Sequence, residues 1–328
     1  MLINTTRTQL AMEEYQMTRK AIFYVRQGYF PEILHRWQWQ TGRLLKQEND
    51  IEKAVGFYQK AIVTDYLNDA RKLYNWLIRP VQSALASRQA KTLVIIPDGA
   101  LSLIPFSALH SGKRFLVEEY ALGTVPSLSL TDTRQTGQGD SKILLNGLSE
   151  ARQGFMPLKN VRNELQDIEG MTDSKILLNQ NFTVENLDAE MQNQDYDIVH
   201  LATHAVFGDK PEDTFLLTYD DRLMGLKKYQ EKQLDLLTLS ACETAVGDER
   251  VAFGLAGVAI RAGAKSALWK VDDDNATSLI IEEFYQQYMT TNISKAKALQ
   301  NAQIKLIDDK KFEHPIYWAS FLLIGNWM

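Results

Sequence analysis

Two apolar runs between Tyr196 and Cys242 constrain the fold of this chain more than any other feature. The first run, DIVHLATHAVF, starts at Asp197, and the second, LDLLTLSACETAVG, starts at Leu234. Their length and their content of Leu, Val and Thr are typical of strands buried on both faces, as in a parallel sheet. Ligands of an open parallel sheet bind beyond the carboxyl ends of its strands. Because His204 and Cys242 each follow one run, we expect the two side chains to meet at one edge of the sheet.

Cys242 is the only cysteine in the chain, so it takes part in neither an internal disulfide nor a multi-thiolate metal site. A thiol needs a nearby base or cation to be a good nucleophile at neutral pH, and His204 is a candidate for that base. The commonest role of a lone cysteine is that of a buried structural thiol. A histidine after an apolar strand is often only a polar cap. Both alternatives stay open on these residues alone.

The composition argues against several classes of protein. The 328 residues are 45% hydrophobic and 23% charged, with a formal net charge of -5, which is ordinary for a soluble globular protein. No basic block predicts a nucleic-acid groove, and no apolar run approaches the ~18 residues of a membrane span. The first residues lack the pattern of a signal peptide. Together with the single cysteine, these features predict a cytoplasmic protein with no nucleic-acid partner and no membrane partner.

His200 lies four residues before His204. Two histidines at this spacing could bind a metal on a helix, but the run that contains them reads as a strand, and no third ligand is apparent. We therefore predict no metal and no cofactor. We expect His200 to be a hydrogen-bonded residue of the core.

Strand and helix patterns alternate from residue 141 to the end of the sequence. The predicted order is strand, helix, strand, helix, two strands separated by a short hairpin or loop at 214–230, helix, strand, two helices and a closing strand. This alternation predicts a mostly parallel sheet covered by helices on both faces. Upstream, residues 92–109 predict a strand, a Pro-Asp-Gly turn and a second extended run. Residues 115–130 predict another hairpin or extended stretch.

The first part of the chain, from about residue 5 to 90, looks helical. The small and aromatic positions of a tetratricopeptide repeat are matched in spacing by Gly42, Ala54, Tyr58 and Ala61. Trp37 and Trp39 bracket the expected Trp position, and no proline marks the repeat end. We predict a TPR-like all-α segment over 1–67 and a second domain over 68–328; a plain helical hairpin is the alternative. Because stable arrays need about three repeats, we expect either the tail of a longer array or a pair that packs onto the second domain.

Five blocks of sequence in order resemble one known family. They are PDGALSLIPFSAL, ATHA with His204, LSACETA with Cys242, GLAGVAIRAGAKSALWKVDD and HPIYWASFLLIGNW. Together they resemble the CHAT domain, the caspase-like peptidase domain commonly found behind tetratricopeptide repeats, over about residues 68–328. The resemblance implies the α/β fold of caspases and separases, a mostly parallel sheet flanked by helices. It also implies a catalytic dyad of His204 and Cys242.

The same resemblance implies an oxyanion hole of backbone N–H groups, which here are those of Ala205 and Cys242. The residue after the catalytic histidine is usually Gly in this family, and Ala205 departs from that pattern. Alanine keeps the N–H group but restricts the backbone angles, so the departure bears on the geometry of the hole. Removing one such donor typically costs about 2.7–4 kcal/mol of transition-state stabilisation.

Acidic residues after two predicted strands are candidates for substrate binding. Asp272 and Asp273 follow the strand that contains Trp269, and Asp248 and Glu249 lie in the loop after the nucleophile. Carboxylates at this edge would favour an Arg or Lys side chain, with Trp269 as a pocket wall. The alternatives are a helix cap for the aspartates, solvated loop charge for the other pair, and core packing for the tryptophan. We expect a basic or neutral residue before the cut rather than an acidic one.

These observations favour a cysteine endopeptidase of the caspase and separase type. It would act on a protein substrate and be controlled or targeted by a protein partner of the TPR-like helices. The alternative is a non-catalytic protein-interaction scaffold with a caspase-like fold. A small-molecule α/β hydrolase or transferase is less favoured, because the sequence has no G-x-S-x-G elbow and no phosphate-binding Gly motif. The sequence leaves open the cleavage-site preference, the substrate, the trigger, the oligomeric state and whether the chain is part of a longer protein.

Overall fold

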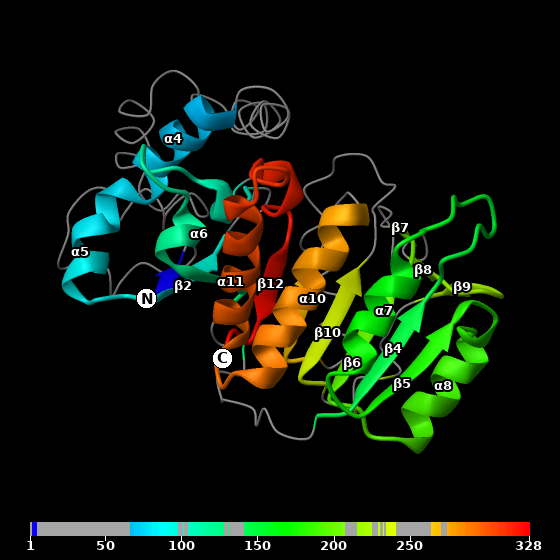
Figure 1. Ribbon diagram of the computed structural model, residues 1–328. Helices are drawn as coiled ribbons and strands as arrows, with labels where there is room; N and C mark the ends of the chain where they lie inside the picture. Colours follow the sequence, from blue (N-terminus) through cyan, green and yellow to red (C-terminus); the bar gives the residue numbers. More distant parts are fainter. Residues whose placement is uncertain are drawn as a thin grey trace. The chain divides into compact units, whose positions relative to one another are not determined.

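The computed structural model of this chain (Figure 1) describes residues 2–4, 66–97, 101, 104–127, 131, 141–206, 215–224, 229, 232, 234–240, 264–269 and 274–328. The chain divides into two compact units, Met1–Leu130 and Thr131–Met328. The residues that carry the TPR-like pattern, from Trp37 to Ala61, lie outside the described ranges. The TPR-like segment and the domain boundary at 67/68 therefore stay predictions.

Three parallel strands form the sheet of the first unit. They are, in spatial order, β1 (Leu2–Asn4), β2 (Thr92–Ile96) and β3 (Ala121–Thr124). Four of the five residues of β2 are buried, which is typical of a central strand covered on both faces. Strand β1 lies in the segment that we predicted to be all-α. That prediction is wrong for these first residues, whose backbone pairs with β2 instead.

The helices of the first unit are α4 (Tyr66–Leu77), α5 (Gln82–Ser87) and α6 (Leu116–Glu119), with 3-10 helices at Arg79–Val81 and Phe106–Ala108. Helix α4 buries Ala70, Tyr74 and Leu77. Their spacing of four and three residues places them on one helix face. This face packs in a cluster with the apolar side chains of β2, so the predicted helix before the first long strand is confirmed.

Two stretches of this unit differ from the extended structure that we predicted. After β2, residues Phe106–Ala108 form a 3-10 helix, in which the Ala108 N–H donates to the Pro105 carbonyl at 3.0 Å. The ring of Pro105 fixes its φ, here -71°, at a value that suits the start of a turn. Within 115–130, a short helix precedes β3 because the Glu118 carboxylate accepts from the Phe115 N–H at 2.6 Å and caps the first turn.

The larger sheet of the second unit has six described strands in the order β12-β11-β10-β6-β4-β5. Neighbouring strands are parallel throughout, except that β11 and β12 are antiparallel. The strands are β4 (Ile143–Gly147), β5 (Ser174–Leu178), β6 (Ile198–Ala202), β10 (Leu236–Ser240), β11 (Ser266–Trp269) and β12 (Leu322–Gly325). The prediction of a mostly parallel α/β sheet is confirmed for this unit.

Helices cover both faces of this sheet, and every residue of β4, β6 and β10 is buried. The helices are α7 (Val161–Glu169), α8 (Val184–Asn193), α10 (Asp274–Thr290) and α11 (Lys295–Asp308), with 3-10 helices at Asn179–Asn181 and Pro315–Tyr317. Leu187 and Met191 of α8 pack with Val199 and Leu201 of β6. Helices α7 and α10 contact each other and lie side by side over β4, β6 and β10 (Figure 1).

A small antiparallel sheet joins β7 (Ala205–Val206), β8 (Phe215–Leu217) and β9 (Arg222–Leu223). It starts directly after β6 and includes the hairpin that we predicted between the two apolar runs. The Thr218 hydroxyl stabilises the tight turn of that hairpin by donating to the Asp221 carbonyl at 2.7 Å. The small sheet therefore extends the structure past the carboxyl end of β6.

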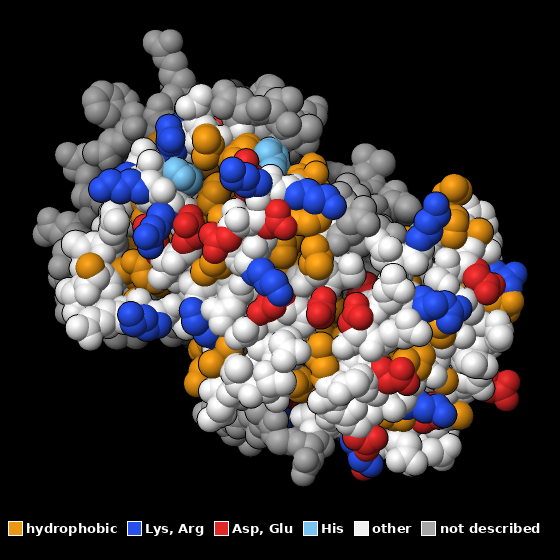
Figure 2. All heavy atoms as spheres, viewed as in Figure 1, with side chains coloured by type: hydrophobic (Ala, Val, Ile, Leu, Met, Phe, Trp, Pro, Cys, Tyr) orange, Lys and Arg blue, Asp and Glu red, His pale blue; other side chains and the backbone are white. Residues whose placement is uncertain are grey.

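The described surface carries charges of both signs. Lys and Arg side chains lie next to Asp and Glu side chains over the face shown in Figure 2. Some of them form ion pairs along one helix, such as Lys72 with Asp69 at 2.7 Å. Within the described ranges, no helix is both long enough and apolar enough to cross a bilayer.

Candidate active site

His204 follows β6 at the carboxyl edge of the second unit's sheet. Ala202 ends β6 and pairs with Ser240 at the end of β10 and with Gly147 at the end of β4. The Thr203 N–H donates to the Ser240 carbonyl at 3.2 Å, one residue beyond this register. The backbone that presents His204 is thus tied directly to the end of β10.

Two contacts fix the imidazole of His204, which is only 6% exposed. Its Nε2 lies 2.7 Å from the Met156 carbonyl oxygen. Because a carbonyl oxygen only accepts, Nε2 carries the proton, and in the neutral ring Nδ1 is then the basic nitrogen. The Phe155 ring lies 4.9 Å from the imidazole, centroid to centroid. These contacts set both the tautomer and the plane of the ring, with Nδ1 as the proton acceptor.

The segment that carries Phe155 and Met156 connects β4 to α7 and is itself anchored. At its start, the Asn179 side-chain oxygen accepts from the Ser149 N–H at 2.8 Å. Asn179 holds a φ of +51°, a left-handed conformation that Asn adopts more readily than most residues. Further along, the Arg152 guanidinium lies 3.7 Å above the centroid of the Tyr219 ring. The Met156 carbonyl that orients His204 therefore belongs to a loop that is held by contacts to Asn179 and to Tyr219.

Ala205 is placed with its N–H group directed away from β8. Ala205 faces Leu216 in the β7–β8 pairing, and the Leu217 N–H donates to the His204 carbonyl at 2.9 Å. This is the pattern of a non-hydrogen-bonded antiparallel pair, in which the amide of the central residue points outward from the ladder. The N–H that we predicted to bind an oxyanion is thus not used in the pairing with β8.

The other predicted site residues lie outside the described ranges. They are Cys242, Asp248, Glu249, Asp272 and Asp273, together with the side chain of Trp269, whose backbone ends β11. The structure brings together His204, Ala205 and the end of β10. The roles of Cys242 and of the acidic residues stay predictions.

Three residues that support His204 were not predicted from the sequence. The Met156 carbonyl is a backbone group, so no residue type signals it, and it lies 48 positions from its partner. Phe155 belongs to a short segment without strand or helix periodicity. Asn179, directly after a strand, carried a usable signal, because Asn at such a position favours a turn with positive φ.

His200 is a hydrogen-bonded core residue, as we expected. It is fully buried, and its Nε2 lies 2.9 Å from Glu164 Oε1. Among the described residues, no group of three or more His, Cys, Asp and Glu side chains is arranged to hold a metal ion.

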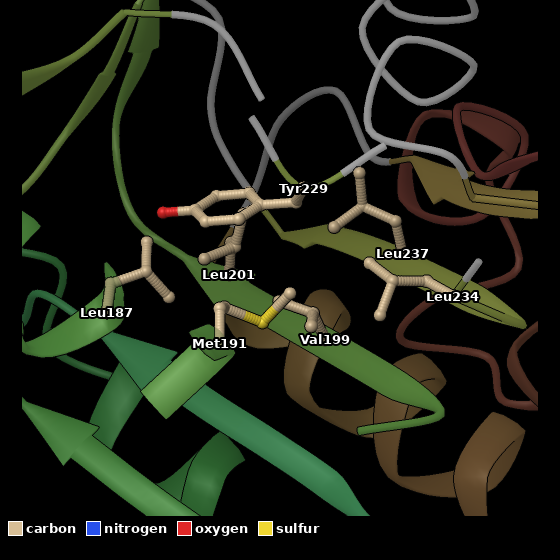
Figure 3. Close-up of a pocket in the computed structure, with 7 residues that line it drawn as sticks. All are labelled: Leu187, Met191, Val199, Leu201, Tyr229, Leu234 and Leu237. Atoms are coloured by element: carbon tan, nitrogen blue, oxygen red, sulfur yellow. The ribbon is translucent and has the colours of Figure 1, made fainter. Parts of the chain in front are cut away.

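A small apolar gap lies on the sheet face that α8 covers. Seven side chains surround it and point toward one another (Figure 3): Leu187, Met191, Val199, Leu201, Tyr229, Leu234 and Leu237. The Tyr229 hydroxyl, the only side-chain group there able to donate a classical hydrogen bond, is bonded to Asp188. The gap belongs to the apolar core and not to the edge that carries His204.

Two solved structures of cysteine proteinases are similar to this chain. The crystal structure of the Arg specific cysteine proteinase gingipain R is 12% identical, with a TM-score of 0.48, and 85% of this chain and 74% of that chain are covered. The complex of the RgpB pro- and mature domains of Porphyromonas gingivalis is 12% identical, with a TM-score of 0.46 and coverage of 85% and 76%. No functionally curated protein matches. The family profile of the CHAT domain matches residues 67–326, well over half of the sequence. The chain therefore belongs to the CHAT domain family.

Proposed function

We propose that this chain is a cysteine endopeptidase in which Cys242 is the nucleophile and His204 is the general base. Membership of the CHAT domain family is consistent with this chemistry. The scissile bond would be a peptide bond in a protein substrate. The activity would be controlled or targeted by a protein partner of the TPR-like segment, whose pattern runs from Trp37 to Ala61.

The observation that carries the proposal is the register of β6 and β10. Ala202 and Ser240 are register partners at the ends of two neighbouring parallel strands. His204 and Cys242 each follow two residues later. Two residues of chain limit the distance between the Cα atoms of Ser240 and Cys242 to about 7 Å, and neighbouring strands are about 4.8 Å apart. A thiol within reach of the imidazole is what a dyad needs, and catalytic contacts are often loose without substrate.

The chemistry follows from the tautomer of His204. Nδ1 takes the thiol proton, and the thiolate sulfur forms a bond to the scissile carbonyl carbon. The imidazolium keeps its Nε2–H bond to the Met156 carbonyl, which holds the ring and stabilises its positive charge. The C–N bond then breaks, and His204 gives its proton to the leaving amine. Water hydrolyses the thioester and restores the thiol.

The oxyanion of the tetrahedral intermediate would be bound by the N–H groups of Ala205 and Cys242. The orientation of the Ala205 amide away from β8 supports this role, because a donor engaged in the ladder could not serve. Preorganised donors of this kind typically contribute about 2.7–4 kcal/mol each. We further propose that the acidic pairs Asp248–Glu249 and Asp272–Asp273 favour a basic or neutral residue before the cut.

A peptide-library cleavage assay tests the proposal. Wild type, Cys242→Ala and His204→Ala are compared, with His314→Ala as a control that removes an imidazole from the same unit. We expect cleavage by wild type and the control and none by the other two. Equal cleavage by Cys242→Ala and wild type would refute the proposal. A wild type that cleaves nothing, and whose cysteine reacts with iodoacetamide no faster than a free thiol, would instead favour a non-catalytic scaffold.

A further inference from the structure

Four buried polar side chains lie on one face of the sheet beneath the candidate active site. His200 belongs to β6, Thr238 to β10, Tyr285 to α10 and Glu164 to α7. His200, Thr238 and Tyr285 are each 0% exposed, and Glu164 is 4% exposed. Polar groups buried this deeply are costly unless they are hydrogen-bonded, so their pairing decides whether they stabilise or weaken this part of the fold.

The four side chains form one continuous hydrogen-bonded chain. Thr238 Oγ1 lies 2.8 Å from the Tyr285 hydroxyl, which lies 3.3 Å from His200 Nδ1. His200 Nε2 lies 2.9 Å from Glu164 Oε1. Burial, acting together with the charge of Glu164, raises the pKa of Tyr285, while its bond to Thr238 acts the other way. The phenol therefore keeps its proton at working pH and can bridge two partners.

The directions of these bonds are mutually consistent. The Glu164 carboxylate accepts from Nε2–H of His200, and in the Nε2–H tautomer Nδ1 accepts from the Tyr285 hydroxyl. The Tyr285 oxygen in turn accepts from the Thr238 hydroxyl. The Tyr285 hydroxyl is thus the link that joins β10 to β6 through side chains, in addition to the backbone ladder. Bonds that polarise one another in a buried chain strengthen the whole network.

The position of this bridge relates it directly to the dyad. His200 and Thr238 are register partners in β6 and β10. His204 lies four residues after His200, and Cys242 lies four residues after Thr238. The hydrogen-bonded bridge therefore joins β6 and β10 at one level of the sheet, four residues before His204 on one strand and four residues before Cys242 on the other.

We infer that Tyr285 is a positioning residue, which sets the distance between the base and the nucleophile through His200 and Thr238. This inference rests on the proposed function, since it deepens the role of the same site. In this proposal Tyr285 acts through His200 and Thr238, to which its hydroxyl is hydrogen-bonded. Loss of its hydroxyl is expected to slow the chemical step, because small misplacements of reacting groups are costly to the rate, about 100-fold for 1 Å.

The first test compares Tyr285→Phe with Tyr288→Phe. Tyr288 is the matched control: it lies on the same helix, is 2% exposed, and donates to Asp235 Oδ2 at 2.8 Å just before β10, at the opposite end of the strand. Both variants lose one buried hydroxyl and should show similar shifts in melting temperature. We expect Tyr285→Phe to lower kcat by about 10-fold or more with KM little changed, and Tyr288→Phe to leave kcat within about 2-fold.

The second test is carried by Thr238, and it holds if Tyr285→Phe does not fold. Thr238→Ser keeps the hydroxyl that donates to Tyr285, whereas Thr238→Val keeps the shape and removes the donor. We expect Thr238→Ser to retain most of the kcat and Thr238→Val to lose it. The opposite order, or equal loss in both, would mean that packing and not the hydrogen bond matters, and would overturn the inference.

Alkylation of the single cysteine separates this inference from the proposed function. Iodoacetamide labels Cys242 alone, and its rate follows the thiolate population that the base supports. We expect Tyr285→Phe to slow labelling toward the rate of His204→Ala, and Tyr288→Phe to leave it unchanged. If wild type cleaves no peptide but this pattern of labelling holds, the peptidase function fails and the positioning role stands. If wild type cleaves and the two tyrosine variants label and cleave alike, the positioning role fails and the peptidase stands.

Discussion

The buried ion pair between Lys295 and Asp235 gives the largest stability effect that we predict from a single exchange of charge. Lys295 starts α11 and is fully buried, and its Nζ lies 3.1 Å and 3.2 Å from the two carboxylate oxygens of Asp235. The same ammonium donates to the Met328 carbonyl at 3.0 Å. Burial lowers the pKa of Lys295, while the charge of Asp235 acts in the opposite direction. Each of the two charges therefore offsets the energetic cost of burying the other.

Lys295→Met removes the charge and keeps an apolar side chain of similar reach. In wild type the Asp235 carboxylate accepts from the Lys295 ammonium and from the Tyr288 hydroxyl, and the variant leaves it only the hydroxyl, at 2.8 Å. The Met328 carbonyl also loses a donor. Removing one partner of a buried ion pair typically costs about 3–5 kcal/mol. The control is Lys305→Met on the same helix, whose ion pair with Glu283 leaves the lysine 60% exposed. A pair of that kind contributes about 0–1 kcal/mol.

Urea unfolding followed by circular dichroism measures both changes. We expect the midpoint to fall far more for Lys295→Met than for Lys305→Met, with the slope m unchanged, and the two free energies of unfolding to differ by at least about 2 kcal/mol. Asp235→Asn in the Lys295→Met background should recover part of the loss, because it neutralises the orphaned charge. Equal losses in the two lysine variants, or a further loss from Asp235→Asn, would refute the reasoning.

Three further predictions concern the backbone, the active-site loop and pH. Gly325→Ala should lower the free energy of unfolding, measured by thermal denaturation, by at least about 2 kcal/mol, because Gly325 has a φ of +97° and an added Cβ meets the Lys265 carbonyl. The control Gly154→Ala should lower it less, because Gly154 has a φ of +87° but open space around it. Asn179→Ala should lower kcat by about 10-fold, because the loop that presents the Met156 carbonyl loses its anchor, whereas Asn186→Ala, on an exposed bond, should not. Burial raises the pKa values of Tyr229 and Tyr285 above the ordinary value of about 10. The stability that these groups contribute is full below about pH 10 and is lost as the pH rises further. The tyrosinate absorbance of these two groups, measured among the 13 tyrosines as the difference between wild type and a Tyr229→Phe, Tyr285→Phe double variant, should therefore appear together with unfolding; its appearance in the folded protein would contradict this.

The elements that sequence periodicity predicts well are those with long buried runs. The strands β4, β6 and β10 are buried along their whole length, and their Leu, Ile and Val runs stand out from the flanking polar segments. The helices between β4 and β6 favoured a parallel direction for these two strands, whereas the segment between β6 and β10 was predicted as a short hairpin or loop. The placement of His204 at the carboxyl edge was therefore predictable from the residue pattern alone.

The contacts that orient His204 were not predictable in the same way. A hydrogen bond from a side chain to a distant backbone carbonyl depends on tertiary structure and not on residue type.

Glu164 is a different case, because Val161, Leu165 and Ile168 form an apolar stripe on α7, and Glu164 falls within it. A carboxylate inside an apolar stripe indicates a buried partner, which is His200. The prediction of a second extended run after β2 was wrong, because Pro105 starts a turn although the segment has the apolar content of a strand.

Variants in the sheet and variants in the segments after the strands should affect catalysis in different ways. His204, Thr203 and the His200–Tyr285–Thr238 bridge are held by the strands, by their register and by α10. These parts do not depend on which side chain a substrate presents, so changing them alters the rate for every peptide by a similar factor. The acidic pairs proposed for recognition, in contrast, lie in segments after the strands. Changing Asp248 or Asp272 should alter the ratio of rates between peptides with basic and neutral residues, because that ratio depends on the difference in transition-state binding between substrates. A change in Tyr285 that altered this ratio would mean that the bridge also shapes the substrate pocket, and the separation of the two roles would not hold.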